Sequence, residues 1–451
     1  MVSSFFNDLV QKLGDRSRYL LGLSRDVVAG GDLAEIGAAL LSRRGEASGV
    51  ALARALLEGY AAAPLAARLA FLTALADRFG ADPRRVEEAV AAYRQDPSPD
   101  HVLALHQSAE APRQELFRRL NLAPGGTAAL VRMRAELLDH LPSRPDLRPV
   151  DSDFVHLFSS WFNRGFLVLR PIDWATPANI LERIIRYEAV HAIRDWDDLR
   201  ARLEPDDRRC FGFFHPQLAD EPLIFVEVAL TSEIPGAIAP LLAADRRPIR
   251  AVDATTAVFY SISNTQKGLG GVSFGHFLIK QVAEDLRRAL PNLRTFVTLS
   301  PVPGFARWLG EARRTRSDLL PDDVIAGLAA LDEPGYASDP ARLESLRRPL
   351  TTAAANYFLR ARDGRGRPLD PVARFHLGNG ARLERLNPFG DLSEKGLAQS
   401  HGLMVNYCYD LDEIERNHEA YAEKGEVIAS SAIRRLARPD RATTRELAAA
   451  Q

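Results

Sequence analysis

The sequence changes character near residue 145, and this change limits the chain to folds that join a helical part to a part with a β-sheet. Residues 33–140 are rich in Ala, Leu, Arg and Glu, and apolar residues such as Leu72, Leu75 and Phe79 recur at helical spacing. After residue 150, short runs rich in Val, Ile, Phe and Thr alternate with helical stretches. We therefore predict a multidomain protein, with an all-α helical bundle followed by a mixed-sheet α/β domain.

The stretch 141–150 marks the predicted domain boundary. It contains three prolines, Pro142, Pro145 and Pro149. Proline lacks the N–H group that the interior of a helix requires, so we expect a stiff extended connection here. The predicted domains are residues 1–145 and residues 146–451, and a chain of 451 residues is long enough for two separate cores.

Charge and cysteine usage exclude several classes of function. The 58 basic and 59 acidic side chains give a formal charge of −1, so no overall field attracts nucleic acid or an anionic membrane. No apolar run reaches the roughly 18 residues of a membrane span, and residues 1–26 have the pattern of an amphipathic helix rather than a signal peptide. Cys210 and Cys408 are the only cysteines, and the histidines form no metal-ligand pattern. We expect a cytoplasmic protein without a metal.

A predicted strand, a glycine-rich turn and an amphipathic helix follow one another over residues 256–290. Glycines before a helix let backbone N–H groups approach an anion, so the turn is a candidate phosphate site, with a flexible connection as the alternative. The turn matches neither the Walker A nor the Rossmann pattern. The segment GVSFG matches a nucleophile elbow, but a long loop separates it from the strand, and we expect Ser273 to cap the helix.

Three single residues lie in segments whose backbone is well specified. Ser300 ends a predicted strand, and His376 lies in a short helix that we expect to begin after Asp370 and to end at Gly380. Tyr409 follows the predicted strand GLMVNYCY. A catalytic role for each competes with a structural one, as a capping hydroxyl, a core histidine and a core tyrosine, and the residues by themselves leave both readings open.

Eight segments spread over most of the chain match one known family. They are GGTAALVRMRAELL, EAVH, RRCFGFF, EPLIFVEVALT, SISNTQKGLGGV, LSPVPGF, DPVARFHLGNGA and GLMVNYCY. In these segments the chain resembles the malonyl-CoA decarboxylase family. The resemblance implies an N-terminal helical domain that makes a homodimer or homotetramer. It also implies a C-terminal catalytic domain with the GNAT N-acetyltransferase fold.

The resemblance also implies which residues form the site. The serine of SPVPGF, Ser300, the histidine of FHLxNGA, His376, and the second tyrosine of NYxY, Tyr409, correspond to the family's active-site residues. The segment SISNTQKGLGGV is implied to bind coenzyme A through Ser263, Asn264, Gln266, Lys267, Gly268, Gly270, Gly271 and Val272. The loop departs from the acetyltransferase pattern at Leu269, where that superfamily has glycine, so the resemblance does not specify which amides contact phosphate.

The implied reaction is loss of CO2 from malonyl-CoA to give acetyl-CoA. The thioester carbonyl accepts the electron pair, so we expect no metal and no organic cofactor. We expect Ser300 to hydrogen-bond the malonyl carboxylate or carbonyl, Tyr409 to orient His376, and His376, with a pKa near neutral, to protonate carbon two. The alternatives are a GNAT-type acyltransferase, an acyl-CoA thioesterase that uses Ser273 and His376, and a non-catalytic interaction protein.

Overall fold

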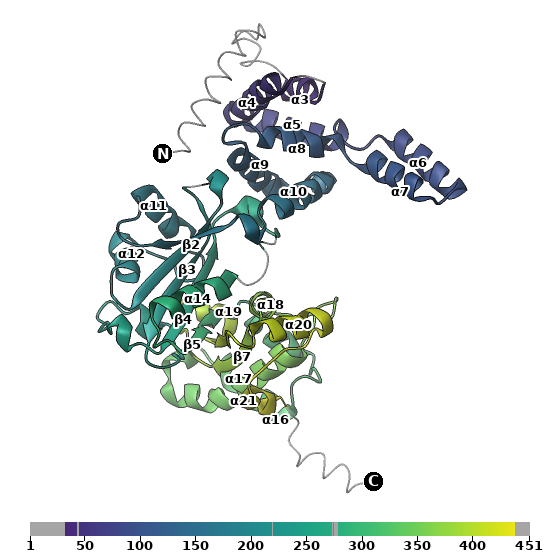
Figure 1. Cartoon of the computed structure of the whole chain (residues 1–451). Coiled ribbons are helices and arrows are strands. Elements are labelled where there is room, and N and C mark those ends of the chain that lie inside the picture. The colour runs from purple at the N-terminus through teal and green to yellow at the C-terminus, as the bar shows by residue number, and fades with distance from the viewer. Residues whose placement is uncertain (1–31, 43–44, 219, 273, 275–277, 438–451) are drawn as a thin grey trace, which may run out of the picture. The chain divides into compact units, whose positions relative to one another are not determined.

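The computed structural model describes residues 32–42, 45–218, 220–272, 274 and 278–437. The chain forms two compact units (Figure 1). The first comprises Met1–Val168, Phe214–Glu221 and Gln266–Phe274, and the second comprises Leu169–Phe213, Pro222–Thr265 and Gly275–Gln451. The amphipathic helix predicted for residues 1–26 and the helix cap predicted at Ser273 lie outside the described residues.

The first unit consists of helices, which confirms the helical prediction for this part of the chain. Its α-helices are α3 (Leu33–Leu41), α4 (Glu46–Ala62), α5 (Leu65–Asp77), α6 (Pro83–Gln95), α7 (Pro99–Ala109), α8 (Pro112–Asn121), α9 (Gly126–His140) and α10 (Arg148–Trp161). Local chemistry sets their ends. Asp82 caps α6 by accepting a hydrogen bond from the N–H of Arg84 at 3.0 Å, and Pro83 occupies the first turn.

The proline-rich stretch forms a turn over residues 141–143 and is helical from Pro145, which corrects the expectation of an extended connection. Pro145 begins the 3-10 helix η1 (Pro145–Leu147), and Pro149 lies in the first turn of α10. Proline fits there because the N–H groups of a first turn have no partner within the helix. The helix α10 then buries Phe154 and Phe158 in the first unit, which continues to Val168.

Helices α6 and α7 form a hairpin that has almost no core of its own (Figure 1). Ala89 is the only buried residue of α6, and α7 buries none. Tyr93, Val102 and Leu103 are exposed on the hairpin. Two helices that bury so little apolar surface gain little stability from each other in water.

The second unit is built on a mixed sheet, as predicted. The strands are β1 (Val168–Ile172), β2 (Arg208–Phe214), β3 (Pro222–Thr231), β4 (Thr256–Asn264), β5 (Thr295–Thr298), β6 (Ser300–Pro301), β7 (Arg382–Asn387) and β8 (Met404–Cys408). Their order is β1-β2-β3-β4-β5-β8-β6, with β7 paired to β8. Strand β4 is antiparallel to β3 and parallel to β5.

Helices pack around this sheet in the second unit. They are α11 (Ala178–Tyr187), α12 (Trp196–Leu203), α13 (Ala239–Leu242), α14 (Leu278–Ala289), α15 (Phe305–Arg314), α16 (Asp322–Gly327), α17 (Pro340–Arg360), α18 (Pro371–Gly378), α19 (Glu394–Ser400), α20 (Ile414–Lys424) and α21 (Ser431–Leu436). Across the described part of both units, none of the helices is long and apolar enough to cross a membrane.

Strands β4 and β5 pair over only part of their length. Thr256–Phe259 pair with Thr295–Thr298, and β4 then continues to Asn264. The chain beyond Thr298 turns to β8 instead, where Ser300 pairs with Val405. The two parallel strands therefore diverge at the point where Ser300 begins β6.

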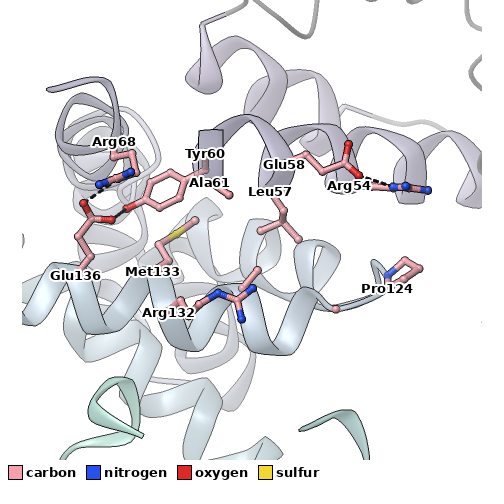
Figure 2. Close-up of a pocket in the computed structure, with 12 residues that line it drawn as sticks. Arg54, Leu57, Glu58, Tyr60, Ala61, Arg68, Pro124, Arg132, Met133 and Glu136 are labelled. Carbon is pink, nitrogen blue, oxygen red and sulfur yellow. Dashed lines mark hydrogen bonds and ion pairs between the residues drawn. The ribbon is translucent and has the colours of Figure 1, made fainter. Parts of the chain in front are cut away.

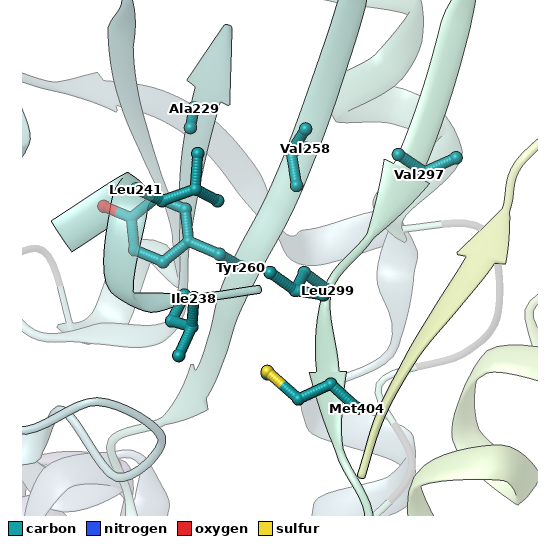
Figure 3. Close-up of a cluster of buried hydrophobic side chains, with 8 residues drawn as sticks. All are labelled: Ala229, Ile238, Leu241, Val258, Tyr260, Val297, Leu299 and Met404. Atoms are coloured by element: carbon teal, nitrogen blue, oxygen red, sulfur yellow. The ribbon is translucent and has the colours of Figure 1, made fainter. Parts of the chain in front are cut away.

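A buried apolar cluster fixes the strands on either side of this divergence (Figure 3). Its members are Ala229, Ile238, Leu241, Val258, Tyr260, Val297, Leu299 and Met404. Val297 and Leu299 alternate along the chain with Thr298 and Ser300, and successive side chains of a strand point to opposite faces. The cluster therefore holds one face of this segment while Thr298 and Ser300 lie on the other.

Candidate active site

Ser300 lies at the first position of β6 and is 6% exposed. Its hydroxyl donates a hydrogen bond to Oγ1 of Thr298, at 2.9 Å. Thr298 also accepts the backbone N–H of Tyr407, at 3.1 Å, and so ties this segment to β8. The restricted backbone around Pro301 and the Thr298 contact hold the Ser300 side chain in one direction.

His376 lies in α18, where the sequence predicts a helix, and is 3% exposed. Asp370 caps this helix by accepting the N–H of Ala373 at 2.7 Å. The chain leaves the helix through Gly380, whose φ of 81° suits glycine. A Cβ on Gly380 would lie 2.1 Å from the carbonyl oxygen of Ile414, so only glycine fits at this stop.

The three residues that the resemblance implied meet in one hydrogen-bonded chain. Nε2 of His376 lies 3.2 Å from Oγ of Ser300, and Nδ1 lies 2.7 Å from the hydroxyl of Tyr409. Tyr409 is 1% exposed, and its ring packs nearly perpendicular to that of Phe259 on β4. Three segments that are distant in the sequence thus place their polar atoms together in the interior of the second unit.

The environment of Tyr409 fixes the direction of these hydrogen bonds. Within the described residues, Nδ1 of His376 is the one partner of the Tyr409 hydroxyl. A buried hydroxyl that only accepted a bond would leave its own proton without a partner, which is costly. We therefore assign Tyr409 as the donor to Nδ1. The ring proton is then on Nε2, which donates to Ser300, and Ser300 donates to Thr298.

The cluster carries no charge at neutral pH. Burial lowers the pKa of His376 from 6.5 to about 3, and burial also raises the pKa of Tyr409 well above its usual value. The expectation of a near-neutral pKa for His376 is therefore wrong for the free protein. The physical reason is that the ring is enclosed by uncharged groups that do not compensate the desolvation of an imidazolium.

Two aromatic rings enclose the imidazole. Tyr407 stacks on its face with ring centroids 4.5 Å apart and an angle of 25° between the planes, and Phe375 meets it edge-on at 5.1 Å. Thr298 and Tyr407 were not predicted from the sequence as functional residues. Thr298 lies two positions before Ser300, and Tyr407 lies two positions before Tyr409. The period of two along a strand places such residues on the same face.

The glycine-rich turn belongs to the first unit, where it packs against α9. Arg134 of α9 donates to the carbonyl oxygen of Gly268 at 2.7 Å, and Lys267 forms an ion pair with Asp139. A Cβ on Gly268 would lie 1.9 Å from the carbonyl oxygen of Val131. The absence of a side chain at Gly268 therefore serves a close backbone contact within the protein.

The other implied coenzyme residues are divided between the units. Ser263 is buried in β4, where its hydroxyl donates to Glu188, and Asn264 is exposed at the end of that strand. In the first unit, Gln266 donates to Glu221 at 2.9 Å. Gly270 and Gly271 are exposed, Gly271 has a φ of 77°, and Val272 is buried.

A cavity of about 650 Å³ opens in the first unit beside α4 and α9 (Figure 2). Its lining residues are Arg54, Leu57, Glu58, Tyr60, Ala61, Arg68, Pro124, Gly125, Ala129, Arg132, Met133 and Glu136. Glu136 accepts hydrogen bonds from Tyr60 and Arg68, at 3.0 and 2.9 Å. None of the residues assigned to the site from the sequence lines this cavity.

The described part of the chain has no group of three or more His, Cys, Asp or Glu side chains placed to hold a metal ion. Both cysteines are free thiols, with Cys210 buried and Cys408 partly exposed. Burial raises the pKa of the Cys408 thiol to about 11, so neither cysteine has the low pKa of a reactive thiolate.

Comparison with known proteins gives concordant matches along the chain. The model of the malonyl-CoA decarboxylase N-terminal domain matches residues 79–162, and that of the malonyl-CoA decarboxylase C-terminal domain matches residues 165–447. The mitochondrial malonyl-CoA decarboxylase of Anser anser anser is 35% identical over 400 residues, which are 81% of this chain and 79% of that protein. The one from Mus musculus is also 35% identical, over 81% of each chain.

Solved structures agree with the sequence matches. A crystal structure of malonyl-CoA decarboxylase from Rhodopseudomonas palustris is 62% identical, has a TM-score of 0.86, and is matched over 90% of this chain and 99% of that one. Another from Agrobacterium vitis is 58% identical with a TM-score of 0.84, over 90% of this chain and 100% of that one. The chain therefore has the fold of these structures.

Proposed function

The chain belongs to the malonyl-CoA decarboxylase family and catalyses the loss of CO2 from malonyl-CoA, and we propose that Ser300, His376 and Tyr409 carry out this reaction. The observation that supports this assignment is the buried hydrogen-bonded chain from Tyr409 through His376 to Ser300. It presents two neutral donors, the Nε2–H group and the serine hydroxyl, beside the point where β4 and β5 diverge.

The chemical difficulty of the reaction is the enolate that forms when CO2 leaves. The bond between carbon two and the carboxylate breaks, and its electron pair moves toward the thioester carbonyl oxygen. Donors fixed in a buried site stabilise such a developing charge strongly, and removal of one donor typically lowers kcat by about 10² to 10³. We assign this role to Ser300, whose hydroxyl turns from Thr298 to the substrate carbonyl or carboxylate.

The reaction also consumes one proton, which must reach carbon two. The malonyl carboxylate is an anion, and an opposite charge nearby favours the protonated form of a histidine. We propose that His376 takes up a proton when the substrate binds. As CO2 leaves, the Nε2–H bond breaks and a C–H bond forms at carbon two, which leaves a neutral ring with its proton on Nδ1, facing the Tyr409 hydroxyl as acceptor.

The same geometry disfavours a thioesterase in which Ser300 is the nucleophile, whereas the alternative that uses Ser273 lies outside the described residues. A serine hydrolase needs the unprotonated Nε2 atom of its histidine to face the serine, and a carboxylate at Nδ1 maintains that tautomer. Here Tyr409 donates to Nδ1, which places the proton on Nε2 and leaves no base for Ser300. Ser300 is therefore proposed as a hydrogen-bond donor and not as a nucleophile.

We propose that the protein needs no metal and no organic cofactor, because the thioester carbonyl itself accepts the electron pair. Coenzyme A is proposed to contact Ser263 and Asn264 in β4 and the turn formed by Gln266, Lys267, Gly268, Gly270, Gly271 and Val272. The two free cysteines support a reducing compartment, and we propose the cytoplasm.

We further propose that the protein is a homodimer or homotetramer held together by its helical part. The α6–α7 hairpin supports this, because it exposes Tyr93, Val102 and Leu103 and buries only one residue of its own. Replacement of Val102 and Leu103 by Asp should shift the molar mass in light scattering toward that of a monomer. An unchanged mass would contradict an interface at the hairpin.

The experiment that tests the proposed function follows three products from malonyl-CoA in the presence of a metal chelator. We expect equal amounts of acetyl-CoA and CO2 and no free thiol, and in heavy water one deuterium per acetyl group. Ser300→Ala and His376→Ala should lose turnover while they keep the circular dichroism of the parent protein. Free thiol without CO2 would contradict the reaction, and full turnover in either variant would contradict the assigned role.

A further inference from the structure

We propose that Tyr407 is a positioning residue that stabilises the protonated imidazole of His376 by stacking on its face. The inference rests on the proposed function, because it concerns the step in which His376 holds the proton destined for carbon two. It adds a residue that makes no hydrogen bond to His376 and acts only through its ring.

The stacking geometry is the first observation that supports this role. The ring centroids of Tyr407 and His376 are 4.5 Å apart and the planes differ by 25°. The face of an aromatic ring carries negative electrostatic potential, and a cation within about 6 Å of the centroid is attracted to it. The attraction is stronger in a desolvated site, and both rings are buried here.

The other neighbours of the imidazole do not supply this stabilisation. The Tyr409 hydroxyl donates to Nδ1, so this contact favours the neutral ring, and the uncharged Ser300 hydroxyl that accepts from Nε2 supplies no opposite charge. Phe375 is nearly perpendicular to the ring, at an angle of 76°, and does not stack on it. Other titratable groups on neighbouring elements are Asp370 and Arg374 on α18, Tyr357 on α17 and His418 on α20, and burial is the cause that lowers the pKa of His376.

The backbone around Tyr407 fixes the position of its ring. The N–H group of Tyr407 donates to Thr298, and Tyr407 pairs with Leu383 of β7. Thr298 is also the residue that accepts the hydroxyl of Ser300. One short network therefore sets both the direction of Ser300 and the height of the Tyr407 ring above His376.

A loss of the stack has a defined consequence for the pH profile. Without the ring face, the protonated form of His376 in the substrate complex becomes less favourable, and its pKa in that complex falls. As the pH rises, the fraction of the substrate complex that carries the proton on His376 then begins to fall at a lower pH. The basic limb of the kcat–pH profile therefore shifts to lower pH. The uncharged free enzyme is not affected in this way, because a neutral imidazole gains little from the ring face.

The test compares Tyr407→Phe, which keeps the ring, with Tyr407→Leu and Tyr407→Met, which fill the space without a π face. We expect Tyr407→Phe to retain kcat within about twofold. We expect both non-aromatic variants to lose about tenfold at pH 7.5, as a cation–π contact of about 1.4 kcal/mol implies. KM should change less than kcat. Equal loss in Tyr407→Phe, or none in the non-aromatic variants, would overturn the proposal.

A direct readout uses S-(2-carboxyethyl)-CoA, a thioether that carries the carboxylate but has no carbonyl to accept electrons and so cannot decarboxylate. In its complex, NMR titration of the His376 ring should give a pKa about one unit lower in Tyr407→Leu than in the parent or in Tyr407→Phe. Binding of this ligand also shows that each variant is folded. An unchanged pKa in a variant that binds the thioether contradicts the stacking role.

The same set of proteins separates this inference from the proposed function. If His376→Ala keeps its turnover, the proton-donor role of His376 is wrong, and the reaction has no protonated imidazole for Tyr407 to stabilise. If His376→Ala is inactive and Tyr407→Leu matches the parent in kcat and pKa, the proposed function stands and only the inference about Tyr407 fails.

Discussion

The cluster of Ser300, His376 and Tyr409 and the glycine-rich turn are implied by the same resemblance, yet their polar groups are in different states. Around His376 the hydrogen bonds join neutral groups, and the Ser300 hydroxyl can exchange Thr298 for a substrate atom. In the turn, Lys267 is paired with Asp139 and Gly268 lies against Val131. The first arrangement holds a hydroxyl that can change partner, whereas in the second Lys267, the side chain that would attract a phosphate, is already paired.

The difference shows that glycines in a turn before a helix can have either of two separate structural reasons. A missing side chain permits close approach of an anion, and it equally permits close approach of another backbone. At Gly268 the second explanation is visible in the structure. At the catalytic cluster no such competing use exists, because Nε2 of His376 and the hydroxyl of Ser300 have only each other and Thr298 as partners within the described residues.

The largest effect is expected from His376→Gln, which keeps the volume and loses the proton donor. We expect kcat to fall about 10³-fold, within the range that general acids contribute, while KM changes little. Steady-state kinetics with malonyl-CoA measure this, and Lys267→Ala serves as the matched variant from the turn. A larger loss of kcat in Lys267→Ala than in His376→Gln would reverse the comparison.

The next effect is a loss of stability when Gly268 receives a side chain. Gly268→Ala places a Cβ against the Val131 carbonyl, and we expect the free energy of unfolding to fall by about 2 kcal/mol, as for other overpacked sites. The control is Gly310→Ala in α15, where no atom lies within 4 Å of the added Cβ and alanine is the better helix former. Urea denaturation of both variants should show loss in the first and slight gain in the second. Equal stability of Gly268→Ala and the parent would show that the turn is free to move.

The buried neutral imidazole predicts a specific pH dependence of stability. The pKa of His376 is about 3 in the folded protein against 6.5 for an unperturbed histidine, so the unfolded state binds a proton first as the pH falls. The difference in pKa contributes its whole amount to the free energy of unfolding above pH 6.5. This contribution is lost progressively as the pH falls toward 3. From pH 7 to pH 5, His376→Gln should therefore lose about 2 kcal/mol less free energy of unfolding than the parent. Parallel curves would contradict a neutral buried ring.

The smallest effect concerns the ion pair between Lys267 and Asp139. Both side chains are more than half exposed, and such pairs contribute little to stability. If Lys267 contacts a coenzyme phosphate, Asp139→Asn frees it and should lower KM about threefold, and Lys267→Ala should raise KM by a similar factor, with kcat unchanged in both. No change in either variant would show that Lys267 is a surface residue of the turn.

The sequence predicted the elements of this fold well where local chemistry decides them. Asp370 and Gly380 set the ends of the helix that carries His376, and their side-chain cap and positive φ depend on nearby residues only. The expectation for Pro145 and Pro149 failed because proline excludes the interior of a helix but not its first turn. Either outcome is compatible with the same local sequence.

The residues of the candidate site were harder to predict from the sequence than the helices and strands. His376 and Tyr409 are buried, as their structural readings expected, Ser300 is buried too, and the three residues meet. Thr298 and Tyr407 could have been found from their positions two residues before Ser300 and Tyr409. The packing of Gly268 against α9 could not, because it joins segments more than a hundred residues apart and depends on tertiary structure.

The contact between Gly268 and α9 has a consequence for how the chain tolerates substitution. The atom that approaches Gly268 most closely is a backbone carbonyl oxygen, which every amino acid supplies, so the contact itself does not require a particular side chain at position 131. Burial limits the size of that side chain, because Val131 is 2% exposed. At position 268 any side chain meets the carbonyl oxygen, so the contact constrains the turn more strongly than the helix.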